Sequence, residues 1–306
     1  MSDSALGLWS ASSTIRRLSI RRLWKLRDFL PRNNAFVRSN RRCWNVAVIL
    51  AATAACAQTR LHHIHLNSTD PDRAISFYTA KFEAERKTYQ GQPAVWVNGS
   101  WLLFTKTAIA PKSAVNSGIW HIGWGGGDDM KGTYQKQLAM GSQFQTPLTD
   151  LSDQCDGKGG NEKFLFAYVD GPDRALIELN TTPAGNHRFG HLHLLSDDPV
   201  AAGEWYVRHL GMTRRSEVRE TRYRCGRRTA PSVSLMVGEI NLIIYPSGPE
   251  RTVTESSAGH AIDHFALTVP NLKEALARIG AKTLRADARS ALIEGPDKVL
   301  IELLEE

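Results

Sequence analysis

The stretch Leu61-His62-His63-Ile64-His65-Leu66, followed by Asp70-Pro71, decides the fold, because the chain contains a second version of it. His191-Leu192-His193-Leu194 and Asp198-Pro199 repeat the same order further along. In both versions, apolar and polar residues alternate as in a strand. The Asp-Pro pair then predicts a helix, with Asp as the N-cap and Pro at the first helical position.

A second repeated segment closes each unit. Residues 171–179 and 295–303 both begin Gly-Pro-Asp and end Ile-Glu-Leu. Internal similarity of this kind indicates a duplicated unit, and we place the two copies at residues 58–182 and 187–306. Within the copies, four strands that carry a His lead into a helix, and short apolar runs follow. The pattern predicts four β-α-β-β-β modules, whose first strands cover residues 61–66, 119–124, 189–195 and 262–269.

The positive charge of the chain is concentrated in a leader, residues 1–57. This segment has ten of the 38 Lys and Arg residues but only two of the 31 Asp and Glu residues. The remaining chain is therefore close to neutral. A nucleic-acid-binding domain needs a basic face, so we expect no nucleic-acid partner.

The leader has the features of an export signal. The uncharged residues 44–57 follow Arg41-Arg42 and end in Ala55-Cys56-Ala57, which matches a cleavage site. We expect a protein exported to the periplasm or the exterior. Two alternatives remain: the leader could stay uncleaved or be lipidated at Cys56, which would be the only membrane contact, or an over-called start codon would leave the protein cytoplasmic. Two further cysteines, Cys155 and Cys225, are expected to carry no chemistry.

The same segments resemble the vicinal oxygen chelate superfamily, which includes glyoxalases, bleomycin-resistance proteins and extradiol dioxygenases. The resemblance covers about residues 60–305. It implies an α+β fold in which four βαβββ modules pair into two glyoxalase-like domains, each forming a cup that opens on a divalent metal. The segments that carry the resemblance are 61–64, 77–78, 190–192, 205–206, 210–212, 262–265 and the two Gly-Pro-Asp endings.

The resemblance also implies the metal ligands, which come from the first and last strands of the modules. With each copy closing on itself, one site would contain His63, His121 and Glu178, and the other His191, His264 and Glu302. The matching last-strand positions, Leu103 and Ile244, are apolar. Two His and one carboxylate suit Fe²⁺, Mn²⁺, Zn²⁺ or Ni²⁺ and leave coordination positions open for a substrate.

Three further residues are candidates for catalysis. His65 and His193 lie two residues after a ligand and share its strand face, so each could be an acid or base, a second-shell group or an alternative ligand. Tyr168 matches the closing signature of extradiol dioxygenases, in which a Tyr helps to bind the substrate. The second copy has Leu292 at that place, which favours the first copy as the active one.

Together these features predict a metal-dependent enzyme that acts on a small oxygen-bearing substrate. A dioxygenase is the first subclass and a lyase or isomerase the second. The alternative is a metal-free small-molecule binding protein of the bleomycin-resistance kind. The sequence does not indicate an oligomeric state.

Overall fold

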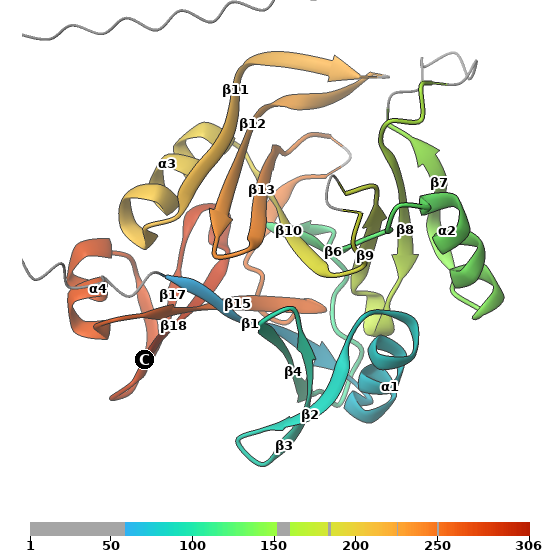
Figure 1. The fold of residues 1–306 in the computed structure, drawn as a ribbon. Helices are drawn as coiled ribbons and strands as arrows, with labels where there is room; N and C mark the ends of the chain where they lie inside the picture. The colour runs from blue at the N-terminus through green and yellow to red at the C-terminus, as the bar shows by residue number, and fades with distance from the viewer. Residues whose placement is uncertain (1–58, 152–159, 183–184, 225, 250) are drawn as a thin grey trace, which may run out of the picture. The chain divides into compact units, whose positions relative to one another are not determined.

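The computed structural model describes residues 59–151, 160–182, 185–224, 226–249 and 251–306 (Figure 1). The leader and both Cys155 and Cys225 lie outside these ranges. Among the described residues, no helix combines the length and apolar character that crossing a membrane requires.

The described chain consists of four modules with the same order of elements, as the sequence predicts. Module one contains β1 (Arg60–Ser68), α1 (Pro71–Lys81), β2 (Glu85–Tyr89), β3 (Gln92–Val97) and β4 (Ser100–Lys106). Module two contains β6 (Ile119–Gly125), α2 (Met130–Ala139), β7 (Phe144–Asp150), β8 (Leu165–Asp170) and β9 (Leu176–Asn180). Module three contains β10 (Phe189–Ser196), α3 (Pro199–Leu210), β11 (Thr213–Arg224), β12 (Arg227–Val237) and β13 (Ile240–Pro246). Module four contains β15 (Ile262–Val269), α4 (Leu272–Ile279), β16 (Thr283–Ala286), β17 (Ser290–Glu294) and β18 (Leu300–Glu305).

Local sequence sets the helix boundaries. The N-cap side chains of Asp70, Asp129 and Asp198 each accept a hydrogen bond from a backbone N–H in the first turn of their helix. This bond satisfies a donor that has no partner within the helix. Helices α3 and α4 end at Gly211 and Gly280, which adopt the left-handed conformation with φ of 69° and 59°. Glycine is favoured there because it has no Cβ to clash.

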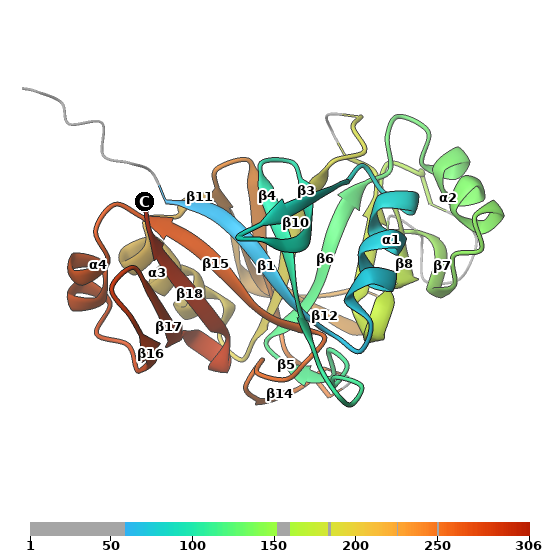
Figure 2. The same cartoon turned by 90° about the horizontal axis from the view of Figure 1, so that it is seen from below.

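The modules pair into two eight-stranded sheets. The middle sheet joins modules two and three in the order β11-β12-β13-β10-β6-β9-β8-β7. The terminal sheet joins modules one and four in the order β16-β17-β18-β15-β1-β4-β3-β2. Figure 2 shows β1, from the start of the described chain, beside β15 from near its end. The predicted α+β fold of four paired βαβββ modules is therefore confirmed.

The predicted pairing within each half of the chain, residues 58–182 and 187–306, is wrong. The centre of each sheet is an antiparallel contact between two first strands, β10 with β6 and β1 with β15. Each of these contacts joins strands from different halves. A sheet is completed only when both halves are present.

The two modules within each half of the chain, one with two and three with four, contact each other through their helices instead. Phe82, just after α1, packs against Trp124 of β6, with ring centres 4.8 Å apart. Tyr206 of α3 likewise faces Phe265 of β15 at 6.4 Å. All these aromatic residues except the partly buried Phe82 are fully buried. Helix packing therefore joins the two sheets, while strand pairing joins the two halves of the chain.

The two Gly-Pro-Asp turns reinforce this arrangement. They form short 3₁₀ turns, η1 (Pro172–Arg174) between β8 and β9 and η2 (Pro296–Lys298) between β17 and β18. Asp173 accepts a hydrogen bond from the Thr69 hydroxyl at 2.6 Å, and Asp297 accepts one from the backbone N–H of Asp197 at 3.1 Å. Each bond connects a turn of one sheet to the segment that leads into a helix of the other sheet, α1 or α3. The repeated Asp thus has a structural role.

We expect the fragment 187–306 not to form a stable monomer. Strands β10 and β15 would lose their partners β6 and β1, which exposes two central strand edges. Size-exclusion chromatography with light scattering should show aggregation or self-association. Co-expression with residues 58–182 should yield a 1:1 complex that unfolds like the full chain. A monomeric 187–306 fragment with cooperative thermal unfolding would contradict the observed pairing.

Candidate metal centres

Four buried side chains of the middle sheet converge on one point, and we call them the middle cluster. His121 comes from β6, Glu178 from β9, and His191 and His193 from β10. One ligand atom of each residue lies within 4.8 Å of those of the other three. The antiparallel register places His193 directly opposite His121, and the parallel β6–β9 register places Glu178 beside Gly123.

The donor atoms of the middle cluster fit a metal ion. Nε2 of His121 lies 2.8 Å from Oε2 of Glu178, and Nε2 of His191 lies 3.8 Å from the same oxygen. Both nitrogens are buried, and neither meets Oε2 of Glu178 or any other described atom with hydrogen-bond geometry. A buried polar atom without a partner carries a desolvation cost of about 1–3 kcal/mol. Coordination of one cation between these atoms would remove that cost.

The terminal sheet contains an equivalent group, the terminal cluster. It consists of His63 and His65 on β1, His264 on β15 and Glu302 on β18. Oε2 of Glu302 lies 3.4 Å from Nε2 of His63 and 3.7 Å from Nε2 of His264. Both nitrogens are buried without a hydrogen-bond partner. His65 pairs with His264 in the same register as His193 with His121.

The histidines of the terminal cluster have more hydrogen-bond partners behind them than those of the middle cluster. Oδ1 of Asp263 lies 2.7 Å from Nδ1 of His264 and accepts a hydrogen bond from it, which leaves the lone pair of the neutral His264 at Nε2. Nδ1 of His63 lies 2.9 Å from Nδ1 of His62, so the same tautomer is available to His63. Such contacts orient a ligating His and raise its basicity. In the middle cluster, Trp120 stands at the place of Asp263, and Nδ1 of His121 has no hydrogen-bond partner.

The two carboxylates also have different partners. Nδ2 of Asn180 donates to Oε1 of Glu178 at 2.7 Å, and this leaves Oε2 facing the imidazoles. Oε1 of Glu302 accepts from Nη2 of Arg285 at 3.2 Å. The contact with Arg285 makes the carboxylate of Glu302 a weaker electron-pair donor to a metal ion. Asn180 holds Glu178 without such competition.

The protonation states of the middle cluster are those that metal ligands need. Burial lowers the pKa of His121 to about 4 and holds the pKa of His193 well below its usual range. Burial acts to raise the pKa of Glu178, but the facing His121 and His191 lower it well below its usual range. At neutral pH, the neutral imidazoles of His121 and His193 therefore face an ionised carboxylate. In the terminal cluster, burial acts to lower the pKa of His264, but the contact with Asp263 raises it above its ordinary value.

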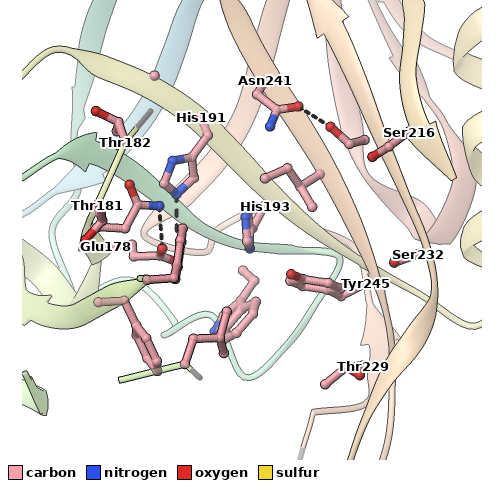
Figure 3. Close-up of a pocket in the computed structure, with 18 of the residues that line it drawn as sticks. Glu178, Thr181, Thr182, His191, His193, Ser216, Thr229, Ser232, Asn241 and Tyr245 are labelled. Atoms are coloured by element: carbon pink, nitrogen blue, oxygen red, sulfur yellow. Dashed lines mark hydrogen bonds and ion pairs between the residues drawn. The ribbon is translucent and has the colours of Figure 1, made fainter. Parts of the chain in front are cut away.

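A large cavity of about 980 Å³ opens on the middle cluster. Figure 3 shows Glu178, His191 and His193 at one side of it and Tyr245 beyond His193. The β12 strand contributes polar groups on the other side. Aromatic side chains make up much of the wall beside the cluster: Trp120, Phe164, Phe166, Tyr168 and Tyr245.

The structure groups the predicted ligands differently from the sequence analysis. His63 lies with His264 and Glu302, whereas His121 and Glu178 lie with His191. The predicted sets, His63 with His121 and Glu178, and His191 with His264 and Glu302, are therefore wrong as sets. The physical reason is the pairing of first strands between the two halves. The six residues themselves all reach one or the other cluster.

The candidate catalytic residues divide between the clusters. His193 and Tyr168 lie in the middle cavity, and the Tyr168 ring centre is 5.0 Å from that of His121. Burial raises the pKa of Tyr168 well above its ordinary value, and the charge of Glu178 adds to this rise. His65 lies in the terminal cluster, where its ring stacks on His264 at 4.5 Å. Leu292 pairs with Glu302 in the register that pairs Tyr168 with Glu178, so the terminal cluster has no equivalent of Tyr168.

The predicted apolar equivalent of Leu103 in the second half of the chain was placed one residue too late, at Ile244. His65 pairs with Leu103, and His193 pairs with Ile243, so Ile243 and not Ile244 is equivalent to Leu103. Ile243 lines the cavity, while Ile244 is fully buried in the core. Neighbouring residues of a strand point to opposite faces, so the shift changes which side chain meets the cup. The conclusion that this position is apolar is unchanged.

Four residues around the clusters were not predicted from the sequence: Asn180, Asp263, Arg285 and Arg251. Asp263 immediately precedes a predicted ligand, and Asn180 lies two residues after one, so adjacency in sequence is a signal that points to both as hydrogen-bond partners of the ligands. Arg285 and Arg251 had no such signal. They reach the clusters only through the folding of β16 and of the segment after β13.

Comparison with known proteins agrees with this architecture. Residues 188–303 match the family model described as the Glyoxalase/Bleomycin resistance protein/Dioxygenase superfamily. A search of curated proteins gives no significant match. Glyoxalase I from Zea mays is similar in structure, with a TM-score of 0.61 and 17% identity over 81% of this chain and 92% of that chain. A Bacillus subtilis protein provisionally named a dioxygenase has a TM-score of 0.52 and 12% identity over 81% of this chain and 86% of that chain.

These likenesses concern the fold, since both identities are low. They extend over most of the described residues, whereas the family model covers modules three and four. Residues 188–303 therefore match the model of the Glyoxalase/Bleomycin resistance protein/Dioxygenase superfamily, and the described chain as a whole is similar in fold to glyoxalase I.

Proposed function

We propose that the protein is a divalent-metal-dependent enzyme that acts on a small oxygen-bearing substrate in the cavity of the middle cluster. The observation that carries the proposal is the convergence of His121, Glu178 and His191, whose buried imidazole nitrogens face one carboxylate oxygen without hydrogen-bond geometry. Two His and one carboxylate are a donor set typical of Fe²⁺ and also suit Mn²⁺, Zn²⁺ or Ni²⁺. When bound, the metal would act as a Lewis acid toward a substrate oxygen.

Of the reaction classes, a dioxygenase fits the middle cluster better than a lyase or isomerase. Glyoxalase-type sites usually take a carboxylate from each module, and the position that would supply the second one is occupied by Ile243. Tyr168 lies next to Glu178 on the neighbouring strand, as in the closing signature of extradiol dioxygenases. An isomerase remains the second candidate because His193 could act as the missing base.

The chain's own residues have separable roles in this proposal. His193 lines the cavity, and its low pKa keeps it neutral, so it can accept a proton from a substrate hydroxyl. Tyr168 stays protonated and can donate a hydrogen bond to a substrate oxygen. The aromatic wall excludes water from one side of the reacting group and favours a planar, apolar portion of the substrate.

We also propose that the basic leader directs export, since its uncharged segment and small-residue ending have the features of a signal peptide. The active centre would then work outside the cytoplasm.

We expect Glu178→Gln and Glu302→Gln each to remove about one metal equivalent from the purified full chain. The substitution keeps the shape of the side chain but removes the one negative charge among the donors of each cluster, and neutral imidazoles alone hold a divalent cation less tightly in a site open to water. Metal content measured by mass spectrometry on tag-free protein checks this. Glu239→Gln, at the same cavity but outside the cluster, is the matched control and should retain the full metal content.

The double variant Glu178→Gln, Glu302→Gln tests the proposal as a whole. Divalent metal binding equal to that of the unmodified protein would overturn the metal-dependent function. The metal-free binding protein would then be the better account.

We expect Asp263→Asn to weaken metal binding at the terminal cluster by about 10- to 100-fold. The carboxylate of Asp263 accepts from Nδ1 of His264 and is itself held by Asn67 at 3.0 Å and by the backbone N–H of Gly259 at 2.8 Å. Competition with a fluorescent chelator, in the Glu178→Gln background, would isolate this site. Asp170→Asn, an exposed residue at the end of β8, is the control, and equal affinity in both variants would mean that Asp263 does not position His264.

A further inference from the structure

We propose that the cavity of the middle cluster binds a small organic anion, whose charged group is held by Arg251 while another oxygen of the same molecule reaches the cluster. This inference rests on the proposed function, because it names the substrate class of the same site. It goes beyond that function by assigning the anion-binding residue and the charge of the substrate.

The charge of the cavity wall favours an anion. Five arginines line it, whereas the acidic residues are three, and one of these, Glu178, faces the imidazoles of the cluster. A divalent metal at the cluster would add further positive charge. A neutral substrate would gain nothing from this arrangement, while an anion is both attracted and oriented by it.

Arg251 is held close to the cluster. Its guanidinium carbon lies 3.9 Å from the centre of the Trp120 ring, and that ring lies 4.3 Å from the ring of His121. The backbone N–H and carbonyl of Arg251 both bond to Gly248, at 2.9 and 3.0 Å, which fixes the start of the side chain. A guanidinium has five N–H donors in a planar fork that matches a carboxylate, and stacking on an aromatic ring orients this fork.

The charge of Arg251 reaches the groups around the cavity. Burial raises the pKa of Tyr245, and Arg251 is one of the two cations that oppose this rise. At Tyr168, Arg251 likewise opposes the rise caused by burial and by Glu178. The guanidinium is therefore electrostatically coupled to both sides of the aromatic wall.

Three more arginines stand at the mouth of the cavity on the β11–β12 hairpin. They are exposed, and the described residues form no ion pair with them: Arg215, Arg224 and Arg228. The hairpin extends beyond β13, since β12 pairs with β13 only from Val233 to Val237. Positive charge at a cavity mouth attracts anions and increases their rate of entry.

The terminal cluster does not share this arrangement. Arg285 donates to Glu302, the carboxylate of the cluster itself. The positive charge of Arg285 is therefore paired with Glu302 within the terminal cluster. Anion binding by an arginine beside the ligands belongs to the middle cavity.

Two probes that differ by one carboxylate test the inference. Catechol and 3,4-dihydroxybenzoate both chelate a divalent metal through vicinal oxygens and both fit an aromatic wall, but only the second carries a carboxylate. With the Mn²⁺-loaded full chain under anaerobic conditions, we expect calorimetry to give about tenfold tighter binding of 3,4-dihydroxybenzoate at pH 7. Arg251→Met should remove most of this preference, and Arg251→Lys should retain part of it.

Arg208→Met, an exposed arginine on α3 outside the cavity, is the control and should keep the full preference. Equal binding of the two probes by the unmodified protein, or an unchanged preference in folded Arg251→Met, would overturn the inference. The metal titration is done first, so that failure to bind Mn²⁺ counts against the proposed function alone. In that case benzoate against benzyl alcohol becomes the probe pair, and equal binding again overturns the role of Arg251.

Discussion

The antiparallel contact between two first strands is the constraint on which both clusters depend. It places His193 opposite His121 in the middle sheet and His65 opposite His264 in the terminal sheet. A shift of one residue would turn every one of these side chains to the other face of its sheet. A parallel last strand then pairs with a first strand in each sheet, β9 with β6 and β18 with β15, so that Glu178 and Glu302 arrive at matching places. Because each contact joins strands from different halves of the chain, neither half can complete a cluster alone.

Much of the architecture could be predicted from the sequence, since the Asp-Pro helix starts, the glycine stops and the Gly-Pro-Asp turns are local signals. The partners of the first strands could not. The four modules are alike, so alternation shows which side chains face a cup but not which strand edges meet. One hint lay in the connections: residues 181–188, between modules two and three, form the shortest link, and these modules share a sheet. The longer links, around 107–118 and 247–261, contribute β5 (Asn116–Ser117) and β14 (Val253–Glu255), which pair with each other.

The six predicted ligands all reach a cluster because the face of a strand is a local property. Their grouping depended on long-range pairing and was not predictable. The clusters differ further in the contacts made by four other residues, Asn180, Asp263, Arg285 and Arg251. Three of these four residues make contacts that depend on long-range pairing or on side-chain direction. Asp263 is the exception, since it is adjacent in sequence to the histidine that it contacts.

The clusters share their ligand types but differ in what surrounds them. The terminal cluster has a carboxylate behind one histidine and a cation on its own carboxylate. The middle cluster has an amide behind its carboxylate and a large, positively charged cavity in front. The two clusters therefore place similar ligands in surroundings of different charge and access.

Anomalous diffraction from crystals soaked in Mn²⁺ tests the central claim most directly. The account predicts a peak enclosed by His121, Glu178 and His191, and a second peak enclosed by His63, His264 and Glu302. Peaks absent from both positions, or a metal held by ligands from the two different clusters, would contradict it.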